Sequence, residues 1–348
     1  MNRKVISPSE WKEPVTNSPK LASAMISHHA ASYDAQGKLK DTPANRALHP
    51  YTISQEDFEG LFDLDCCYWH DDTTVILQGD ALHVLRRMQE TNVLVNCAVT
   101  SPPYYGQRDY GVDGEIGLER NPQDFIDSLR DIFHELNGVL TDTGSLWVNI
   151  GDTYWSGKGA STGTDDKQSA RRFGKRPQDY PGDGHWMRPK QLLLIPHRMA
   201  IALQDDDWLV RNDNIWVKPN PLPDPVRDRC AVSHEHVFHF TKSRWYYFDK
   251  SKVGTPNSKG RIIPPKDTWT VQQSSGAALG GSAHKASYPL ELLRIPIDST
   301  APENGVVLDP FMGSGTTLQY ARMKGLRSIG IELNSEYCEL AVHKIKEN

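Results

Sequence analysis

Strand-like apolar runs alternate with amphipathic, helix-like segments from Thr74 to the end of this 348-residue chain. In the last fifty residues, predicted strands at 305–309 and 328–332 alternate with predicted helices at 316–324 and 336–346. A strand, a crossover helix and a second strand form a parallel unit whose helix covers one face of the sheet. The pattern therefore predicts an α/β fold with a mostly parallel sheet and helices on both faces.

The same alternation is visible further upstream. Strands are predicted at residues 75–77, 93–99, 144–150 and 215–217, and helices at 81–89, 122–140 and 191–203. The more polar segment before residue 73 contains a predicted short helix at 54–64, with Ser54 as its N-cap.

The composition divides the chain into two parts. We predict an N-terminal extension of unknown role at residues 1–72 and a catalytic domain at residues 73–348. Within this domain, the Gly- and Ser-rich stretch at about 153–186 is predicted to be a mobile insertion, and residues from about 220 to 283 form a second variable region.

Charge is distributed unevenly along the sequence. The whole chain carries a formal net charge of −5, yet residues 158–266 contain 20 Lys and Arg against 12 Asp and Glu. This middle region therefore carries +8 and the remainder −13. A basic middle region is typical of a phosphate-binding surface, although charges scattered over a solvated face would give the same count.

A glycine-bearing turn near the C-terminus joins a strand to a helix. Its residues are candidates for cofactor binding: Asp309, Pro310, Phe311, Gly313, Ser314, Gly315, Thr316 and Thr317. Such a turn brings backbone N–H groups close to a ligand. Glu332 ends the next strand, where a carboxylate accepts hydrogen bonds from the ribose hydroxyls of a nucleoside.

The residues of this turn restrict the identity of that nucleoside. A nicotinamide fingerprint requires a third small residue where Leu318 stands, and a phosphate-binding P-loop requires a lysine that this turn lacks. A cofactor without phosphates fits better, which points to S-adenosylmethionine.

A second loop, which contains two prolines, follows the predicted strand at 93–99. It consists of Thr100, Ser101, Pro102, Pro103 and Tyr104. Prolines stiffen the loop and supply carbonyl acceptors without N–H groups. Oxygen acceptors from such a loop are suited to hold both hydrogens of a base amino group, while an aromatic ring stacks on a base that has left the duplex.

Together the two loops resemble those of the DNA amino-methyltransferases that modify cytosine N4 or adenine N6. That family combines an Asp/Asn/Ser-Pro-Pro-aromatic catalytic loop with an F-x-G-x-G cofactor loop. Here Ser101–Tyr104 precedes Phe311–Gly315, an order that resembles the permuted β-type class. Further segments resemble the family at 79–82, 145–152, 215–220 and 284–289.

The resemblance implies a class I S-adenosylmethionine-dependent methyltransferase fold, Rossmann-like, with an inserted target-recognition region. It implies Ser101, Pro102, Pro103 and Tyr104 as catalytic residues, and Asp80 and Thr100 as cofactor neighbours in addition to the glycine turn and Glu332. The substrate implied is double-stranded DNA, and direct methyl transfer is expected because the catalytic loop contains no cysteine nucleophile.

Several alternatives stay open from the sequence alone. Ser101 favours cytosine N4 over adenine N6, whose enzymes usually carry Asp at this position. The same chemistry on RNA and a catalytically silent DNA-binding regulator are the rivals. A cognate restriction endonuclease and a homodimer are further expectations.

Basic side chains in the two inserted regions are candidates for DNA phosphate contacts. These are Arg171, Arg172, Lys175, Arg176, Lys250, Lys252, Lys259, Arg261 and Lys266.

We expect no metal site at His234, Glu235, His236 and His239, because methyl transfer requires none. Asp152 is a candidate acceptor for the proton released during transfer. The odd number of cysteines and their spacing do not indicate a disulfide framework, and no apolar run is long enough to span a membrane, so we expect a cytoplasmic protein.

Overall fold

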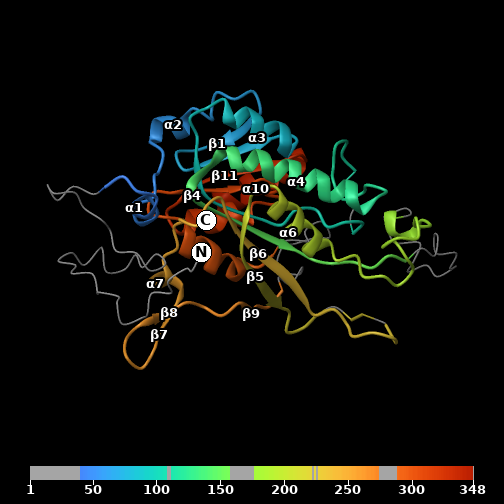
Figure 1. The fold of residues 1–348 in the computed structure, drawn as a ribbon. Helices are drawn as coiled ribbons and strands as arrows, with labels where there is room; N and C mark the ends of the chain where they lie inside the picture. Colours follow the sequence, from blue (N-terminus) through green and yellow to red (C-terminus); the bar gives the residue numbers. More distant parts are fainter. Residues whose placement is uncertain are drawn as a thin grey trace, which may run out of the picture.

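The computed structural model describes residues 40–107, 111–156, 176–221, 223–224, 226–273 and 288–347. Within these residues a nine-stranded sheet forms the centre of the molecule, in the order β1-β2-β11-β10-β3-β4-β6-β5-β9 (Figure 1). The strands are β1 (Cys67–His70), β2 (Thr74–Gln78), β3 (Val95–Thr100), β4 (Leu140–Ile150), β5 (Leu209–Val217), β6 (His234–Thr241), β9 (Thr268–Thr270), β10 (Val306–Asp309) and β11 (Arg327–Glu332).

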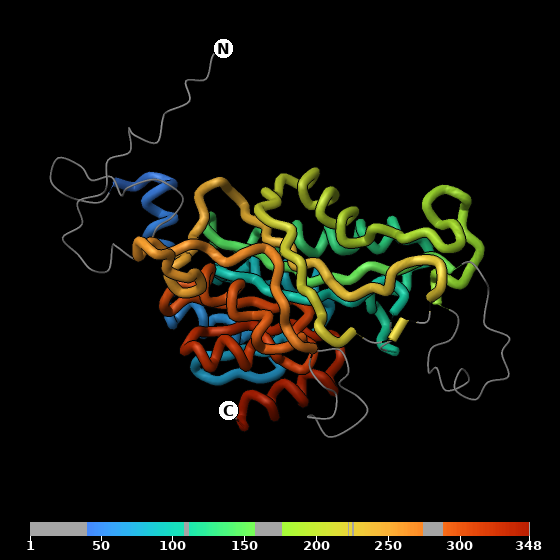
Figure 2. Tube along the Cα trace, turned by 90° about the horizontal axis from the view of Figure 1, so that it is seen from below, coloured from blue at the N-terminus to red at the C-terminus, as the bar shows by residue number. Residues whose placement is uncertain are grey.

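The central strands confirm the predicted parallel arrangement. Strands β2, β11, β10, β3 and β4 run parallel, whereas β6 is antiparallel to both of its neighbours and β1 is antiparallel to β2. Elements from the two ends of the sequence lie side by side, because β11 pairs with β2, and Figures 1 and 2 show the blue and red parts of the chain together on one side.

Helices cover both faces of this sheet, as predicted. The larger core cluster contains side chains of α3 (Ala81–Gln89), α4 (Pro122–Val139) and α6 (Ile195–Asp205). Helix α4 lies between the other two and packs against both. The opposite face is covered by α8 (Arg294–Thr300), α9 (Thr316–Met323) and α10 (Ser335–Lys346).

Alternate residues of each strand face the two layers. In β3, Ala98 joins the larger cluster, while Cys97 and Val99 join the cluster that includes α8. Because both faces are covered, all six residues of β3 are buried. This double burial explains why the strand appears in the sequence as a continuous apolar run rather than as an alternating one.

Several element boundaries differ from the prediction: among them, β4 begins at Leu140 rather than at residue 144, β5 begins at Leu209 rather than at residue 215, and α2 ends at Glu59 rather than at residue 64. The helix predicted at 122–140 ends at Val139, and β4 begins at once with Leu140, which pairs with Val95 of β3. The helix predicted to begin at residue 191 begins at Ile195, where Pro196 occupies the first turn and the backbone N–H of Ile195 is bonded to Asp152.

The described part of the N-terminal segment packs on the same sheet. Ser54 caps α2 (Gln55–Glu59), as predicted, and Phe58 lies in the larger core cluster. Asn96 of β3 donates to the backbone oxygen of Tyr51 at 2.6 Å. The short α1 (Pro43–Leu48) packs through Ala47 against Tyr247.

The remaining described elements are short. The 3₁₀ turns are Pro177–Asp179 and Leu290–Leu293. The small sheet of β7 (Thr255–Pro256) and β8 (Ile262–Ile263) follows the four-residue α7 (Lys250–Val253), and its orange loop extends away from the body of the molecule in Figure 1. Within the described residues, no helix is long and apolar enough to cross a membrane.

His239 is an ionisable residue in the centre of the sheet. Its ring stacks on that of Trp147, with 4.0 Å between centroids, and shares a 3.0 Å hydrogen bond with the Ser145 hydroxyl. Burial lowers the pKa of His239 to about 3, so the folded protein holds the ring neutral.

This burial predicts a loss of stability in acid. The unfolded chain protonates His239 near pH 6.5, whereas the folded protein does not, so the free energy of unfolding falls as the pH drops from 6.5 towards 3. Compared with His239→Gln, the wild-type protein should lose about 2 kcal/mol of stability between about pH 7 and about pH 5, at about 1.4 kcal/mol per unit. Urea denaturation of both proteins measures the difference, and an unchanged gap between them would contradict a neutral, buried His239.

Candidate functional site

The two predicted loops leave the same edge of the sheet from neighbouring strands. Strands β3 and β10 are parallel, with Cα partners at Val307–Cys97 and Leu308–Ala98. At the ends of the two strands, the hydroxyl of Thr100 donates to Asp309 Oδ1 at 2.6 Å. This buried bond joins the last residues of the two strands, so the loops that follow them begin side by side.

The loops line one pocket, which confirms the geometric requirement of the sequence interpretation. Ser101 and Pro103 lie in its wall together with Phe311, Gly313 and Ser314. The cavity is open to solvent, and its space, with the open mouth included, amounts to about 1110 Å³.

Most of the predicted cofactor residues line this pocket. Those that do so are Asp80, Asp309, Pro310, Phe311, Gly313, Ser314, Thr316 and Glu332. Thr100 and Thr317 are fully buried behind the wall, and their hydroxyls donate to Asp309. Pro102, Tyr104 and Gly315 are likewise not part of the lining.

Glu332 is held in place by two backbone groups. Its Oε2 accepts from the N–H of Gly313 at 3.0 Å, and its Oε1 accepts from the N–H of Asn334 at 2.8 Å. Burial raises the pKa of Glu332 above its ordinary value. Each carboxylate oxygen keeps further acceptor capacity, so a ligand with two neighbouring hydroxyls can donate to it.

Asp309 is the buried anchor of the cofactor loop. Besides Thr100, it accepts from the phenol of Tyr288 at 3.0 Å and from the N–H of Phe311 at 3.1 Å. Burial raises the pKa of this carboxyl group as well. Its bonds to three segments fix the start of the loop relative to β3 and to the residues before α8.

Two glycines of the cofactor turn have a left-handed backbone conformation. Gly313 has φ +52° and Gly315 has φ +78°, which only glycine adopts readily. A Cβ at Gly313 meets no atom within 4 Å and stands in the pocket, whereas a Cβ at Gly315 would lie 2.9 Å from Ala341 of α10. A side chain at position 313 would therefore occupy space in the pocket. The absence of a side chain at Gly315 instead permits α10 to pack against the turn.

A lysine that sequence reasoning missed supports this turn. Lys344 of α10 donates to the hydroxyls of Ser314 at 3.0 Å and Thr316 at 3.2 Å. Burial lowers the pKa of Lys344 to about 8. Its position on the last helix, thirty residues beyond the turn, gives no signal in the sequence.

The catalytic loop is connected to strands β4 and β6. The phenol of Tyr104 donates to Glu235 Oε2 at 2.6 Å, and Asn149 Oδ1 lies 3.2 Å from the same hydroxyl. Glu235 also pairs with Lys218, and both side chains are mostly buried. The Tyr104 ring packs on the backbone of Gly151, where an added Cβ would lie 2.8 Å from Cε2.

Asp152 does not reach the pocket, so the structure does not support it as a proton acceptor. Its Oδ1 accepts from the backbone N–H groups of Thr153 at 2.8 Å and Ile195 at 3.1 Å. Asp152 thus binds the backbone at the start of α6. Burial raises the pKa of its carboxyl group.

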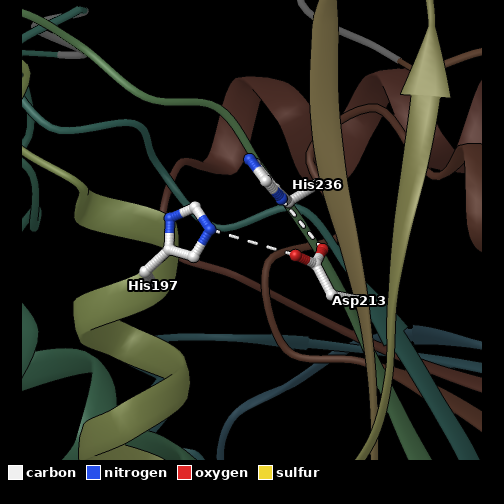
Figure 3. Close-up of side chains that lie close together, drawn as sticks. All are labelled: His197, Asp213 and His236. Carbon is white, nitrogen blue, oxygen red and sulfur yellow. Dashed lines mark hydrogen bonds and ion pairs between the residues drawn. The ribbon is translucent and has the colours of Figure 1, made fainter.

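A histidine–aspartate cluster lies on the sheet face covered by α6. Figure 3 shows the Asp213 carboxylate of β5 facing the rings of both His236 of β6 and His197 of α6. Asp213 lies 2.8 Å from His236 Nδ1 and 3.9 Å from His197 Nε2. The three candidate ligand atoms all lie within 4.8 Å of one another, a spacing compatible with ligation of one metal ion.

Asp213 connects α6 to β5 and β6 through its contacts with the two imidazole rings. Of the four residues weighed from the sequence, only His236 belongs to it. His239 lies in the core, and Glu235, which precedes His236 on β6, contacts Tyr104.

The basic candidates fall into three groups. Arg171, Arg172 and Lys175 lie outside the described residues, and Arg176 bonds to Asp179. Lys250 and Lys252 lie on α7, and Lys259, Arg261 and Lys266 lie in the β7–β8 loop and the segment before β9. Lys252, Lys259, Arg261 and Lys266 are exposed, and none has an ion-pair partner among the described residues.

Sequence reasoning missed part of the pocket wall. The missed residues include Val112, Gly114, Glu115 and Ile116 after the catalytic loop, Ile331 and Leu333 beside Glu332, and Tyr337 of α10. Tyr288 belongs to a segment that the resemblance had marked. The residues around 114 are mainly loop, and no periodic pattern indicates that they cover a pocket.

The chemistry of the wall fits S-adenosylmethionine. The described lining residues include Asp80, Glu115, Asp309 and Glu332 but no Lys or Arg. A phosphate group would find no cation there, whereas a ligand with an amino group, a sulfonium and ribose hydroxyls meets carboxylates and apolar side chains. The parallel sheet, the glycine turn and this pocket define a class I S-adenosylmethionine-dependent methyltransferase.

Comparison with known proteins identifies the family. The model of the DNA methylase family matches residues 95–343. The type II methyltransferase M.Cfr9I of Citrobacter freundii is 43% identical over 271 residues, covering 78% of this chain and 87% of the relative. The type II methyltransferase M.SmaI of Serratia marcescens is 40% identical over 270 residues, with 78% and 90% covered.

Solved structures show the same fold. The PvuII DNA methyltransferase, described as cytosine-N4-specific, has a TM-score of 0.57 at 20% identity, covering 78% of this chain and 86% of that one. M1.HpyAVI in complex with S-adenosylmethionine has a TM-score of 0.50 at 18% identity, with 78% and 98% covered. The chain belongs to the DNA methylase family and is a DNA methyltransferase.

A side chain at Gly313 should block cofactor binding. In Gly313→Val the new methyl groups enter the pocket, and we expect the dissociation constant for S-adenosylmethionine to rise by at least roughly tenfold, from the loss of about 1.4 kcal/mol or more. Isothermal titration calorimetry measures this change.

Gly260→Val is the matched control, because Gly260 has φ +74°, has no neighbour within 4 Å of its Cβ and lies outside the pocket. Both variants carry similar backbone strain. Equal cofactor affinity in the two variants would show that Gly313 does not face the ligand.

Proposed function

We propose that this enzyme transfers the methyl group of S-adenosylmethionine to the exocyclic amino group of a base flipped out of double-stranded DNA, with cytosine N4 as the preferred target. The observation that carries the proposal is the shared pocket of Ser101 and Gly313. This pocket brings the residue suited to hold an amine next to the turn suited to hold the cofactor.

The wall suggests how the cofactor lies. Glu332, already oriented by two backbone N–H groups, accepts from the ribose hydroxyls. Asp80, the N-cap of α3, lies in the wall and would face the adenine, and the turn at Gly313 would hold the methionine part. When bound, S-adenosylmethionine supplies an electrophilic methyl group on a cationic sulfur.

The catalytic loop supplies acceptors for the target amine. The lone pair of an exocyclic amine is delocalised into the base, which makes it a poor nucleophile. Acceptors at Ser101 and at the Pro102 carbonyl hold the two amino hydrogens and favour a nitrogen lone pair directed at the methyl group. Tyr104 stacks on the extruded base.

Two observations favour cytosine. The first position of the catalytic loop is Ser101, which resembles the cytosine-N4 members of the family. The PvuII enzyme, which shares the fold, is described as cytosine-N4-specific. Adenine N6 is the second candidate, since the family includes both reactions.

The exposed lysines and arginine between α7 and β9 are proposed to contact DNA phosphates. Lys259 and Arg261 lie in the β7–β8 loop, which extends away from the body of the molecule in Figure 1. Lys252 lies on α7 and Lys266 before β9, and none of the four forms an ion pair with a described acidic residue. The relatives are type II methyltransferases, which supports a restriction endonuclease as partner. The homodimer and the cytoplasmic location remain predictions.

The base identity can be measured directly. Amplified DNA, which contains no modified bases, is incubated with the enzyme and S-adenosylmethionine, digested to nucleosides and analysed by mass spectrometry. We expect N4-methylcytosine. N6-methyladenine would instead identify adenine as the target base. In a parallel assay with RNA, modification of RNA alone would exclude DNA as the substrate. Cofactor binding without methylation of either nucleic acid would support a silent regulator.

Tyr104→Ala should separate catalysis from cofactor binding. The ring is outside the pocket wall that holds the cofactor, so we expect turnover to fall by roughly tenfold to a hundredfold while cofactor affinity stays within about threefold, because stacking on a base is worth about 1–3 kcal/mol. Tyr68→Ala, an exposed tyrosine on the edge strand β1, is the control. Wild-type turnover in Tyr104→Ala would remove this residue from the mechanism.

A further inference from the structure

A chain of hydrogen bonds runs from the catalytic loop into the sheet. The hydroxyl of Ser101 donates to the hydroxyl of Tyr104 at 3.4 Å, and the hydroxyl of Tyr104 donates to Glu235 Oε2 at 2.6 Å. Glu235 Oε1 forms an ion pair with Lys218. The first bond is long, and hydrogen bonds in active sites commonly shorten when substrate binds.

The direction of these bonds follows from the groups at their inner end. A carboxylate next to an ammonium group only accepts hydrogen bonds. The Tyr104 proton must therefore point to Glu235, and only the oxygen lone pairs of Tyr104 are left for Ser101. Ser101 consequently donates its proton to Tyr104.

The neighbouring asparagine does not reverse this direction. The two hydrogens of the Asn149 amide go to Glu235 Oε2 at 3.0 Å and to the carbonyl of His236 at 3.2 Å. Its oxygen therefore faces the Tyr104 hydroxyl and is another acceptor. Whichever acceptor receives the Tyr104 proton, Tyr104 remains a donor towards the sheet.

We propose that Glu235, held by Lys218, is a positioning residue that makes Ser101 a hydrogen-bond acceptor towards the target amine. A serine hydroxyl can donate or accept, and the mechanism requires acceptance. With its proton committed to Tyr104, Ser101 presents lone pairs to the amino hydrogens. This inference rests on the proposed function and explains what the carboxylate behind the loop contributes.

Local packing supports the position of the ion pair. The side chains of Lys218 and Glu235 are 16% and 13% exposed, so solvent screens their interaction only weakly. The ammonium group of Lys218 also lies 4.8 Å from the centre of the Trp216 ring. Lys218 directly follows β5, and Glu235 lies on the antiparallel neighbour β6, opposite Trp216 in the register.

Glu235→Gln tests the direction of the chain. The side-chain nitrogen that replaces Oε2 can donate to Tyr104 but no longer accepts from the Asn149 amide, so the Asn149 oxygen turns to that nitrogen. Tyr104 then donates to Ser101 and leaves Ser101 with a proton pointing outward. We expect the single-turnover rate of methyl transfer to amplified DNA, measured with radiolabelled S-adenosylmethionine, to fall roughly tenfold to a hundredfold. Cofactor affinity should stay within about threefold, and Glu339→Gln, an exposed glutamate on α10, should behave as wild type.

A double-mutant cycle distinguishes positioning from general structural damage. In a Ser101→Ala background there is no hydroxyl to orient, so Glu235→Gln should then change the rate by less than about threefold. The same loss in both backgrounds, or no loss in the wild-type background, would overturn the proposal.

Tyr104→Phe provides an independent route if the Glu235 variant does not fold. It keeps the ring and removes the connecting hydroxyl, so its rate should equal that of Glu235→Gln, and the double variant should be no slower than either. Additive losses would contradict the hydrogen-bond chain. A wild-type enzyme that methylates no DNA would instead refute the proposed function itself.

Discussion

The buried hydrogen bond between Thr100 and Asp309 holds the site together. These residues are 209 positions apart in the sequence, yet they end adjacent parallel strands, and their side chains meet at 2.6 Å. An unpaired carboxylate at this depth would be costly, and Asp309 is stabilised because Thr100, Thr317, Tyr288 and a backbone N–H all donate to it. The same bonds fix the catalytic loop against the cofactor loop.

The chemistry of the pocket follows from this arrangement. One wall offers carboxylates and backbone groups to a cationic nucleoside without phosphates, and the other offers the hydroxyl of Ser101. Behind Ser101, the sheet supplies a carboxylate and an ammonium group that are both largely removed from water. The cofactor loop and the catalytic loop thus each depend on a buried acidic residue, Asp309 for the first and Glu235 for the second.

Much of this arrangement could be predicted from the sequence, because it depends on strand ends. In a parallel sheet, the segments after β3, β10 and β11 must lie at one edge, so Ser101, Gly313 and Glu332 could be placed together from pattern alone. The distinction between Gly313 and Gly315 could not be predicted, since it depends on the packing of α10 against the turn.

The partners of the catalytic loop were also beyond sequence reasoning. Glu235 was considered among nearby histidines as a metal ligand, and its contact with Tyr104 depends on β6 being inserted antiparallel beside β4. Asp152 follows the correct strand, but its side chain turns to the N-terminus of α6. Side-chain direction at a strand end is decided by the helix that packs there, which a linear pattern does not contain.

The central claim is that both loops serve one reaction, and diffraction from crystals of the enzyme with S-adenosylmethionine tests it most directly. The account predicts density with the ribose on Glu332, the methionine part along the turn at Gly313, and the sulfonium methyl group directed at the space in front of Ser101. Density that fills the pocket with the methyl group directed away from Ser101, or that lies outside this pocket, would contradict it.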